Sequence, residues 1–213
     1  MGLLIFSVVG LLASPLLGLI AGGVVAMGAV ASFKQSGNWS SGKKGELAVT
    51  DALKSLSNDY VLLNDLMLPD GRGNIDHLVI GPNGLFVIET KNYSSYVKCS
   101  GDDWYVNGQK IRSLSKQAKR NAMEIKKNLQ ALFAEHQTGM PFVNALLVFI
   151  SGNGRLNINR PTIPVLRSSE VPEFIARYNA TKRPAFATPE LMRAIVHHLH
   201  LLQQKPDRLL AKN

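Results

Sequence analysis

The chain has 213 residues, of which 24 are Lys or Arg and 15 are Asp or Glu, so its formal net charge at pH 7 is +9. This length allows one sizeable domain and an appendage. The single cysteine, Cys99, excludes an internal disulfide and any zinc site built from cysteines. The positive charge favours a polyanionic partner, either nucleic acid or an anionic membrane surface, although a generic basic surface is the alternative.

Residues 1–33 carry no charged side chain and consist mainly of Leu, Ile, Val, Gly and Ala. We interpret them as a transmembrane anchor, because such a run is long enough to cross a bilayer core of about 30 Å. A cleaved signal peptide is the alternative, since Ala29-Val30-Ala31 resembles a cleavage site, but no basic segment precedes the apolar run. The first charges, beginning at Lys34, all follow the run, so the positive-inside rule predicts a single-pass protein of the cytoplasmic (inner) membrane with its C-terminal domain in the cytoplasm.

A Gly- and Ser-rich linker is predicted over residues 34–45, and a helix over Glu46–Leu56 follows it. Glu46 lies on the apolar stripe of this helix, three residues before Val49. A carboxylate in the first turn is favoured by the helix dipole. The residues alone leave any further role of Glu46 open.

A β-hairpin is predicted in the centre of the chain, where the β-branched runs Ile75–Ile80 and Leu85–Thr90 flank the turn Gly81-Pro82-Asn83-Gly84. Both faces of these strands carry apolar residues, so the hairpin is expected to lie inside a sheet. Two registers are open. If the four turn residues form the loop, Asp76 lies opposite Glu89, and if only Asn83-Gly84 turns, Asp76 lies opposite Lys91.

In both registers, Asp76, Glu89 and Lys91 project from the same face of the sheet. A structural ion pair at the sheet edge is one interpretation. However, like charges placed opposite each other destabilise a strand pair. A divalent cation between Asp76 and Glu89 removes this difficulty, since carboxylate oxygens suit Mg²⁺ or Mn²⁺. Lys91 is then placed to orient a water molecule or to stabilise developing negative charge.

The remaining chain is predicted to alternate strands and helices, which indicates an α/β fold. The expected strands are Tyr60–Leu66, Tyr96–Cys99, Trp104–Val106, Gln109–Ile111 and Phe142–Ile150. The expected helices run from Ser113 or Ser115 to about His136, from about Ser169 to Tyr178, and from Thr188 to about Gln204. This division gives a domain over residues 46–150 and a helical extension over residues 151–213. His197 and His200 are expected in packing or surface roles, because no carboxylate lies near them.

Basic residues crowd the surface of the long helix that follows Ser113. They are Lys116, Lys119, Arg120, Lys126 and Lys127. Such a run is usually a solvated face, and here it is also a candidate track for the phosphates of a nucleic acid. Gln117 lies at the edge of the apolar stripe of the same helix, one turn before Asn121.

The pattern of Asp76 followed by Glu89-Thr90-Lys91 is similar to the Asp…(Asp/Glu)-x-Lys signature of restriction-endonuclease-like phosphodiesterases. The wider sequence, from about Gly42 to Ile150, resembles the nuclease-related domain family, NERD. The resemblance is carried by Gly45-Glu46, Leu62-Leu63-Asn64-Asp65, Asn74-Ile75-Asp76-His77, Gly84–Lys91 and Gln117. It implies a mixed central β-sheet flanked by helices, a Glu46 that points inward to the acidic cluster, and a Gln117 that approaches it.

We therefore expect a membrane-anchored, metal-dependent nuclease. Asp76, Glu89 and the Thr90 carbonyl are expected to bind Mg²⁺ or Mn²⁺ with support from Glu46, while Lys91 positions the attacking water and Gln117 orients the lysine or the substrate. DNA is favoured over RNA as the substrate, and no small-molecule cofactor is expected. The alternative is a catalytically inactive module that binds nucleic acid or recruits a protein at the membrane.

Overall fold

A computed structural model describes residues 42–69, 73–150, 154–178 and 188–204. The predicted anchor over residues 1–33 lies outside these ranges. All the described residues belong to one compact unit, which begins at Gly42. Within the described ranges, no helix combines the length and the apolar character that a membrane span needs.

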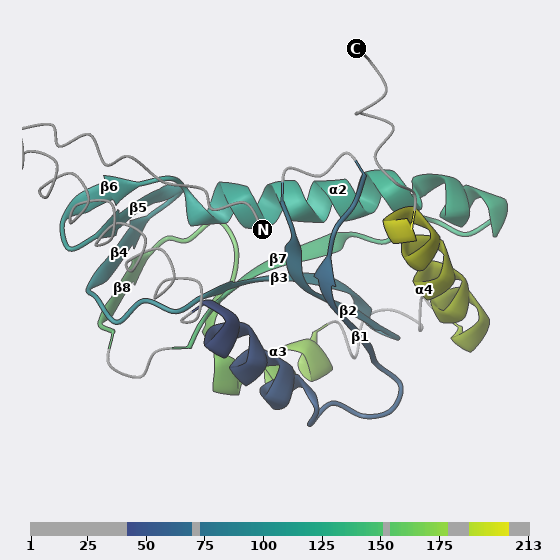
Figure 1. The fold of residues 1–213 in the computed structure, drawn as a ribbon, viewed down its shortest axis with the longest axis horizontal. Coiled ribbons are helices and arrows are strands. Elements are labelled where there is room, and N and C mark those ends of the chain that lie inside the picture. The colour runs from purple at the N-terminus through teal and green to yellow at the C-terminus, as the bar shows by residue number, and fades with distance from the viewer. Residues whose placement is uncertain (1–41, 70–72, 151–153, 179–187, 205–213) are drawn as a thin grey trace, which may run out of the picture. The chain divides into compact units, whose positions relative to one another are not determined.

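A five-stranded mixed sheet forms the centre of the described unit, with the strand order β1-β2-β3-β7-β9 (Figure 1). Its strands are β1 (Val61–Leu66), β2 (Ile75–Gly81), β3 (Gly84–Lys91), β7 (Val143–Phe149) and β9 (Val165–Arg167). The first three are antiparallel, β7 pairs with β3 in parallel, and β9 pairs with β7 in parallel. All seven residues of β7 are buried, as expected of a strand that is covered on both faces.

A second, four-stranded sheet has the order β6-β5-β4-β8. Its strands are β4 (Val97–Ser100), β5 (Asp103–Val106), β6 (Gln109–Ile111) and β8 (Leu156–Asn159). The sequence predicts one central sheet and a helical extension after residue 150. In the structure, β8 and β9 instead complete one sheet each, by parallel pairing with β4 and β7.

In the part of the chain that the structure describes, four helices pack on the sheets (Figure 1). They are a helix over residues 42–53, α2 (Leu114–Glu135), α3 (Val171–Arg177, preceded by a 3₁₀ turn at Ser168–Glu170) and α4 (Pro189–Gln204). The helix over residues 42–53 already includes residues 42–45, which the sequence analysis assigns to the linker. At the start of α2, the Ser113 side chain accepts a hydrogen bond from the Lys116 amide, as an N-cap serine does.

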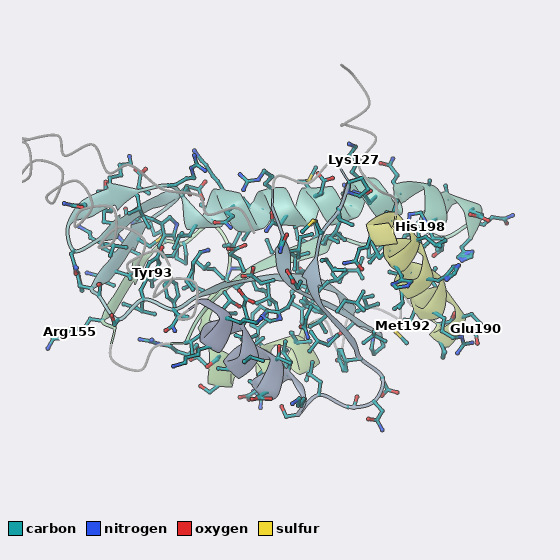
Figure 2. The ribbon with its side chains drawn as sticks, viewed as in Figure 1. Tyr93, Lys127, Arg155, Glu190, Met192 and His198 are labelled. Atoms are coloured by element: carbon teal, nitrogen blue, oxygen red, sulfur yellow. The ribbon has the colours of Figure 1, made fainter. Side chains whose placement is uncertain are left out.

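The two faces of the five-stranded sheet bury separate hydrophobic clusters. Side chains of α2 and α4 pack on one face, together with Leu78, Leu85 and Val87. The helix over residues 42–53 and α3 cover the other face, where Val79 and Phe86 lie. A hydrogen bond also joins the two helices: Nε2 of His198, on α4, lies 2.9 Å from the carbonyl oxygen of Asn128, on α2 (Figure 2 labels His198).

The Tyr60 ring lies so close to Gly81, at the tip of the hairpin, that even an alanine at this position should destabilise the fold. A Cβ on Gly81 would lie 2.2 Å from Cδ1 of the Tyr60 ring. We therefore expect Gly81→Ala to displace the ring and to lower the free energy of unfolding by about 1–3 kcal/mol. Urea denaturation of the single variants and of Gly81→Ala combined with Tyr60→Ala checks this. The two effects must be non-additive, since the second substitution removes the clash, and additive effects would contradict the prediction.

Candidate active site

The register of the hairpin places the two predicted carboxylates across from each other. Ile80 pairs with Leu85 and Gly81 with Gly84, which is the first of the two registers considered from the sequence. The cross-strand pairs continue to His77 and Ile88. The next position along both strands sets Asp76 opposite Glu89.

Asp76 stands where the regular ladder between β2 and β3 ends. Instead of a backbone carbonyl, the carboxylate of Asp76 accepts the hydrogen bond of the Thr90 amide, with an N···Oδ2 distance of 2.7 Å. The N–H and C=O groups of one strand residue point to the same side. The Thr90 carbonyl is therefore directed toward Asp76 as well, as the predicted metal site requires.

Glu89 is held by three side chains, although it is only 2% exposed. Its Oε1 accepts hydrogen bonds from Lys91 Nζ at 2.5 Å and from Gln117 Nε2 at 2.6 Å. Its Oε2 accepts one from Asn121 Nδ2 at 3.1 Å. Gln117 and Asn121 lie one turn apart on α2, so the helix presents two amides to the carboxylate. The sequence analysis notes this spacing but assigns a role only to Gln117.

The pKa values of Asp76 and Glu89 are both raised above their ordinary values, mainly because burial disfavours the charged forms. Desolvation, with the negative charge of Glu89 as the next largest cause, raises the pKa of Asp76 to about 6. Burial likewise raises the pKa of Glu89, although the adjacent Lys91 ammonium works in the opposite direction. The pair is therefore under electrostatic stress that a bound cation would relieve.

The helix over residues 42–53 brings Glu46 to the edge of this cluster. Gly45 is buried, and a Cβ at this position would lie 3.2 Å from Asn92 Cβ and 3.3 Å from Ile150 Cδ1. Without a side chain at Gly45, the helix can approach the ends of β3 and β7 closely. Burial raises the pKa of Glu46, and the charges of Asp76 and Asp65 raise it further, so Glu46 lies within electrostatic reach of the site.

A second row of polar residues supports the β1 side of the site. Asn74 Nδ2 donates to Asp65 Oδ1 at 2.5 Å, and His77 Nδ1 lies 2.8 Å from Asn64 Oδ1. His77 is 1% exposed, and burial lowers its pKa to about 4, so its imidazole is neutral at pH 7. These contacts join residues of β1 to the Asn-Ile-Asp-His segment, and no local sequence pattern predicts which of them pair.

The donor set fits Mg²⁺ or Mn²⁺ rather than zinc. Within the described part of the chain, no three His, Cys, Asp or Glu side chains gather closely enough to form a metal cage. Mg²⁺ does not need one, since it keeps several of its water ligands and is commonly bound by one or two carboxylates. Asp76 and Glu89, with the carbonyl of Thr90, match this requirement.

The basic residues of α2 do not form one uniform surface. Lys116, Arg120, Lys126 and Lys127 are exposed, whereas Lys119 is half-buried and forms an ion pair with Asp102 at 3.1 Å. The charge of Arg120 lowers the pKa of Glu89, so Arg120 lies within electrostatic reach of this carboxylate. Arg120 therefore connects the basic helix to the acidic cluster.

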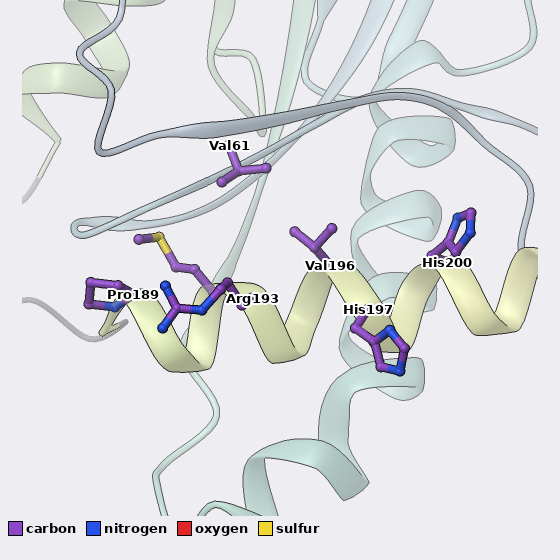
Figure 3. A pocket seen from close by; sticks show the side chains of 7 residues that line it. Val61, Pro189, Arg193, Val196, His197 and His200 are labelled. Carbon is purple, nitrogen blue, oxygen red and sulfur yellow. The ribbon is translucent and has the colours of Figure 1, made fainter.

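The histidines of α4 lie apart from this site. His197 and His200 line a cavity of about 520 Å³ between α4 and β1, together with Val61, Met192 and Val196. Figure 3 shows their imidazole rings on different sides of α4. They do not converge on a common ion, in agreement with the packing or surface role that the sequence favours.

Comparison with known families gives one match. The family described as "Nuclease-related domain", NERD, matches residues 41–150, which include the whole hairpin and α2. No curated protein matches the chain. No solved structure matches it either.

Proposed function

Because the chain belongs to the nuclease-related domain family, we propose that it is a metal-dependent nuclease that hydrolyses phosphodiester bonds of nucleic acids, DNA in preference to RNA. We further propose that residues 1–33 anchor it in the inner membrane, with the nuclease domain in the cytoplasm. The observation that carries the proposal is the position of Asp76 opposite Glu89, with the Lys91 ammonium hydrogen-bonded to the second carboxylate. Two carboxylates on opposite strand positions, one of them buried, destabilise a sheet, so a function is needed to explain them.

The residues that would hold the cation are Asp76, Glu89 and the carbonyl of Thr90, with Glu46 in support. When bound, Mg²⁺ or Mn²⁺ supplies positive charge that offsets the charge developing on the phosphate during hydrolysis. Gln117 and Asn121 fix the Glu89 carboxylate from the α2 side, through one oxygen each. Glu89 therefore has a defined orientation before any ligand arrives, which is the preorganisation that an active site requires.

Lys91 is the group placed to act on the reacting atoms. Its side chain is 20% exposed while that of Glu89 is 2% exposed, so the ammonium lies between the buried carboxylate and solvent. From this position the ammonium can hydrogen-bond a water molecule and hold it in line with the substrate phosphorus atom, or stabilise negative charge on the phosphate oxygens. Arg120, exposed on α2 and near Glu89, is placed to contact a neighbouring phosphate.

Cleavage by the full-length protein in detergent micelles tests the proposal. Fluorescently labelled DNA and RNA, single- and double-stranded, are incubated with Mg²⁺, Mn²⁺ or EDTA. We expect cutting with either metal and none with EDTA. Asp51→Asn is the matched control, because it removes an exposed carboxylate from the helix over residues 42–53. Among the described residues, Asp51 forms an ion pair only with Lys54, at an Nζ···Oδ1 distance of 2.7 Å.

The same assay separates the nuclease from the inert module. Nucleic-acid binding that persists in EDTA, weakens steeply with salt and never leads to cutting would establish the catalytically inactive alternative. Protein that neither binds nor cuts any of these substrates would refute both nucleic-acid functions.

A further inference from the structure

The outer edge of β7 is only half covered by its neighbour. Within the described residues, β9 pairs with β7 at Leu147, Val148 and Phe149 alone. The preceding half of the strand, Val143–Leu146, pairs with β3 on its inner side and with no strand of the described ranges on its outer side. Over Val143–Leu146, the outward-facing N–H and C=O groups of β7 therefore do not belong to a β-ladder with any described strand.

Pro164 is the reason why the ladder stops. The Leu147 amide donates to the Pro164 carbonyl at 3.0 Å, which shows that the Leu147 backbone points outward. Backbone direction alternates along a strand, so the N–H and C=O of Ala145 point outward too. In a parallel ladder, the next donor to the Ala145 carbonyl would be the nitrogen of residue 164, and proline has no N–H.

A groove of about 390 Å³ follows this open edge. Its walls come from both sides of the sheet, with Ala122 and Met123 of α2 on one side and Phe174 and Tyr178 on the other. A strand added to an edge presents alternate side chains to the two faces, so it would contact both walls. Met123 is 62% exposed and Phe142 is 71% exposed, and both line the groove.

The charges in the groove are positive. Lys119 and Lys126 line it, and none of its described lining residues is acidic. Asp102 neutralises Lys119, whereas Lys126 is exposed and forms no ion pair with a described residue. Pairing of two copies through this edge would place two sets of these lysines near each other, which disfavours a self-associated sheet. An acidic partner is complementary instead.

We propose that the β7 edge is a docking site for an extended peptide segment of a partner protein, which adds as a strand beside Val143–Leu146. The backbone of Ala145 provides the hydrogen bonds, Met123 and Phe142 receive apolar side chains, and Lys126 pairs with an acidic residue. This mode of recognition combines main-chain hydrogen bonds with pockets for alternate side chains. The site is separate from the metal centre, because Ala145 and Lys126 are not among the residues proposed to bind the metal or the attacking water, although Lys126 also belongs to the candidate phosphate track of α2.

The test is a selection of random nine-residue peptides against the full-length protein in detergent micelles. The peptide that binds best is synthesised, its affinity is measured by fluorescence anisotropy, and its footprint is mapped by hydrogen exchange. We expect acidic and apolar residues to alternate in the selected peptides, and we expect bound peptide to protect the Ala145 amide from exchange. Lys126→Glu is expected to weaken binding at least about tenfold.

Lys127→Glu is the matched control, since the adjacent lysine is also exposed but does not line the groove, and we expect its affinity to remain unchanged. Ala145→Pro removes the outward N–H of this residue and should abolish binding. If the proline variant does not fold, Met123→Arg takes its place, because it puts a bulky charged side chain at an exposed position in the groove. Failure to select any binder, a footprint away from β7, or equal effects of the two lysine variants would overturn the proposal. Protection of the Ala145 amide by a DNA oligonucleotide but by no peptide would overturn it in favour of a nucleic-acid groove.

Discussion

Replacement of Lys91 by Met is expected to reduce nucleic-acid cleavage by at least about 10²–10³-fold, the effect of deleting one preorganised donor in an active site. The variant keeps most of the aliphatic stem but removes the ammonium that lies 2.5 Å from Glu89 Oε1. The remaining partners of Glu89, Gln117 and Asn121, are neutral amides and cannot replace the positive charge. Single-turnover cleavage at saturating enzyme measures the change in the chemical step without the contribution of substrate binding.

Lys98→Met is the matched control for this experiment, because it removes an exposed lysine of β4 and should leave the rate unchanged. Loss of the ammonium also leaves a buried carboxylate with fewer partners, at an expected stability cost of about 1–3 kcal/mol. Circular dichroism at the assay temperature must therefore show that Lys91→Met is folded. A folded variant that cuts at the wild-type rate would refute the role of Lys91.

Asp76→Asn is expected to make the protein more stable above pH 6 while it abolishes cleavage. The wild-type carboxyl group has a pKa near 6 in the folded protein and an ordinary value of 3.8, mainly because burial and Glu89 disfavour its charged form. The difference corresponds to about 3 kcal/mol, and because Asp76 is partly exposed we expect about 2 kcal/mol to be observed. The asparagine has no charge to bury, and its amide oxygen can still accept the Thr90 N–H.

The sign of this effect follows from proton binding. Between about pH 4 and pH 6, folded wild-type protein holds a proton on Asp76 that the unfolded chain has released, so the wild type loses stability as the pH rises through this window. Asp76→Asn lacks this dependence. Urea denaturation at pH 4, 5, 6 and 8 should show the advantage of the variant to be absent at the lowest pH and complete at the highest.

Mg²⁺ provides the internal control for Asp76→Asn. At pH 8, once the Mg²⁺ concentration exceeds the dissociation constant, the free energy of unfolding of the wild type should rise with the logarithm of that concentration. The free energy of unfolding of the variant should not change. A variant that is less stable than the wild type at pH 8, or that gains equal stability from Mg²⁺, would contradict the assignment of Asp76 as a strained cation ligand.

Sequence reasoning predicts the elements that are long or locally encoded. The hairpin, α2 with its Ser113 cap and the buried strand β7 all follow from periodicity, turn residues and capping. The turn residues alone left two registers open. The structure has the one that pairs Gly81 with Gly84, with the loop reduced to Pro82-Asn83.

The elements that escaped prediction depend on distant partners. β8 and β9 are short, and no tight turn joins either of them to its partner, because each forms by parallel pairing, with β4 and β7 respectively. The same holds in the site. Asn121 touches Glu89 only because α2 packs across β3, and the Asn74–Asp65 contact depends on the pairing of β1 with β2.

The strand β7 ends at Phe149, one residue before the family resemblance ends, and both sheets gain a further strand only afterwards. The segment that matches the family is thus shorter than the segment that forms the two sheets. The family match therefore contains the hairpin and α2, whereas the strands β8 and β9, which complete the two sheets and flank the open half of β7, lie outside it.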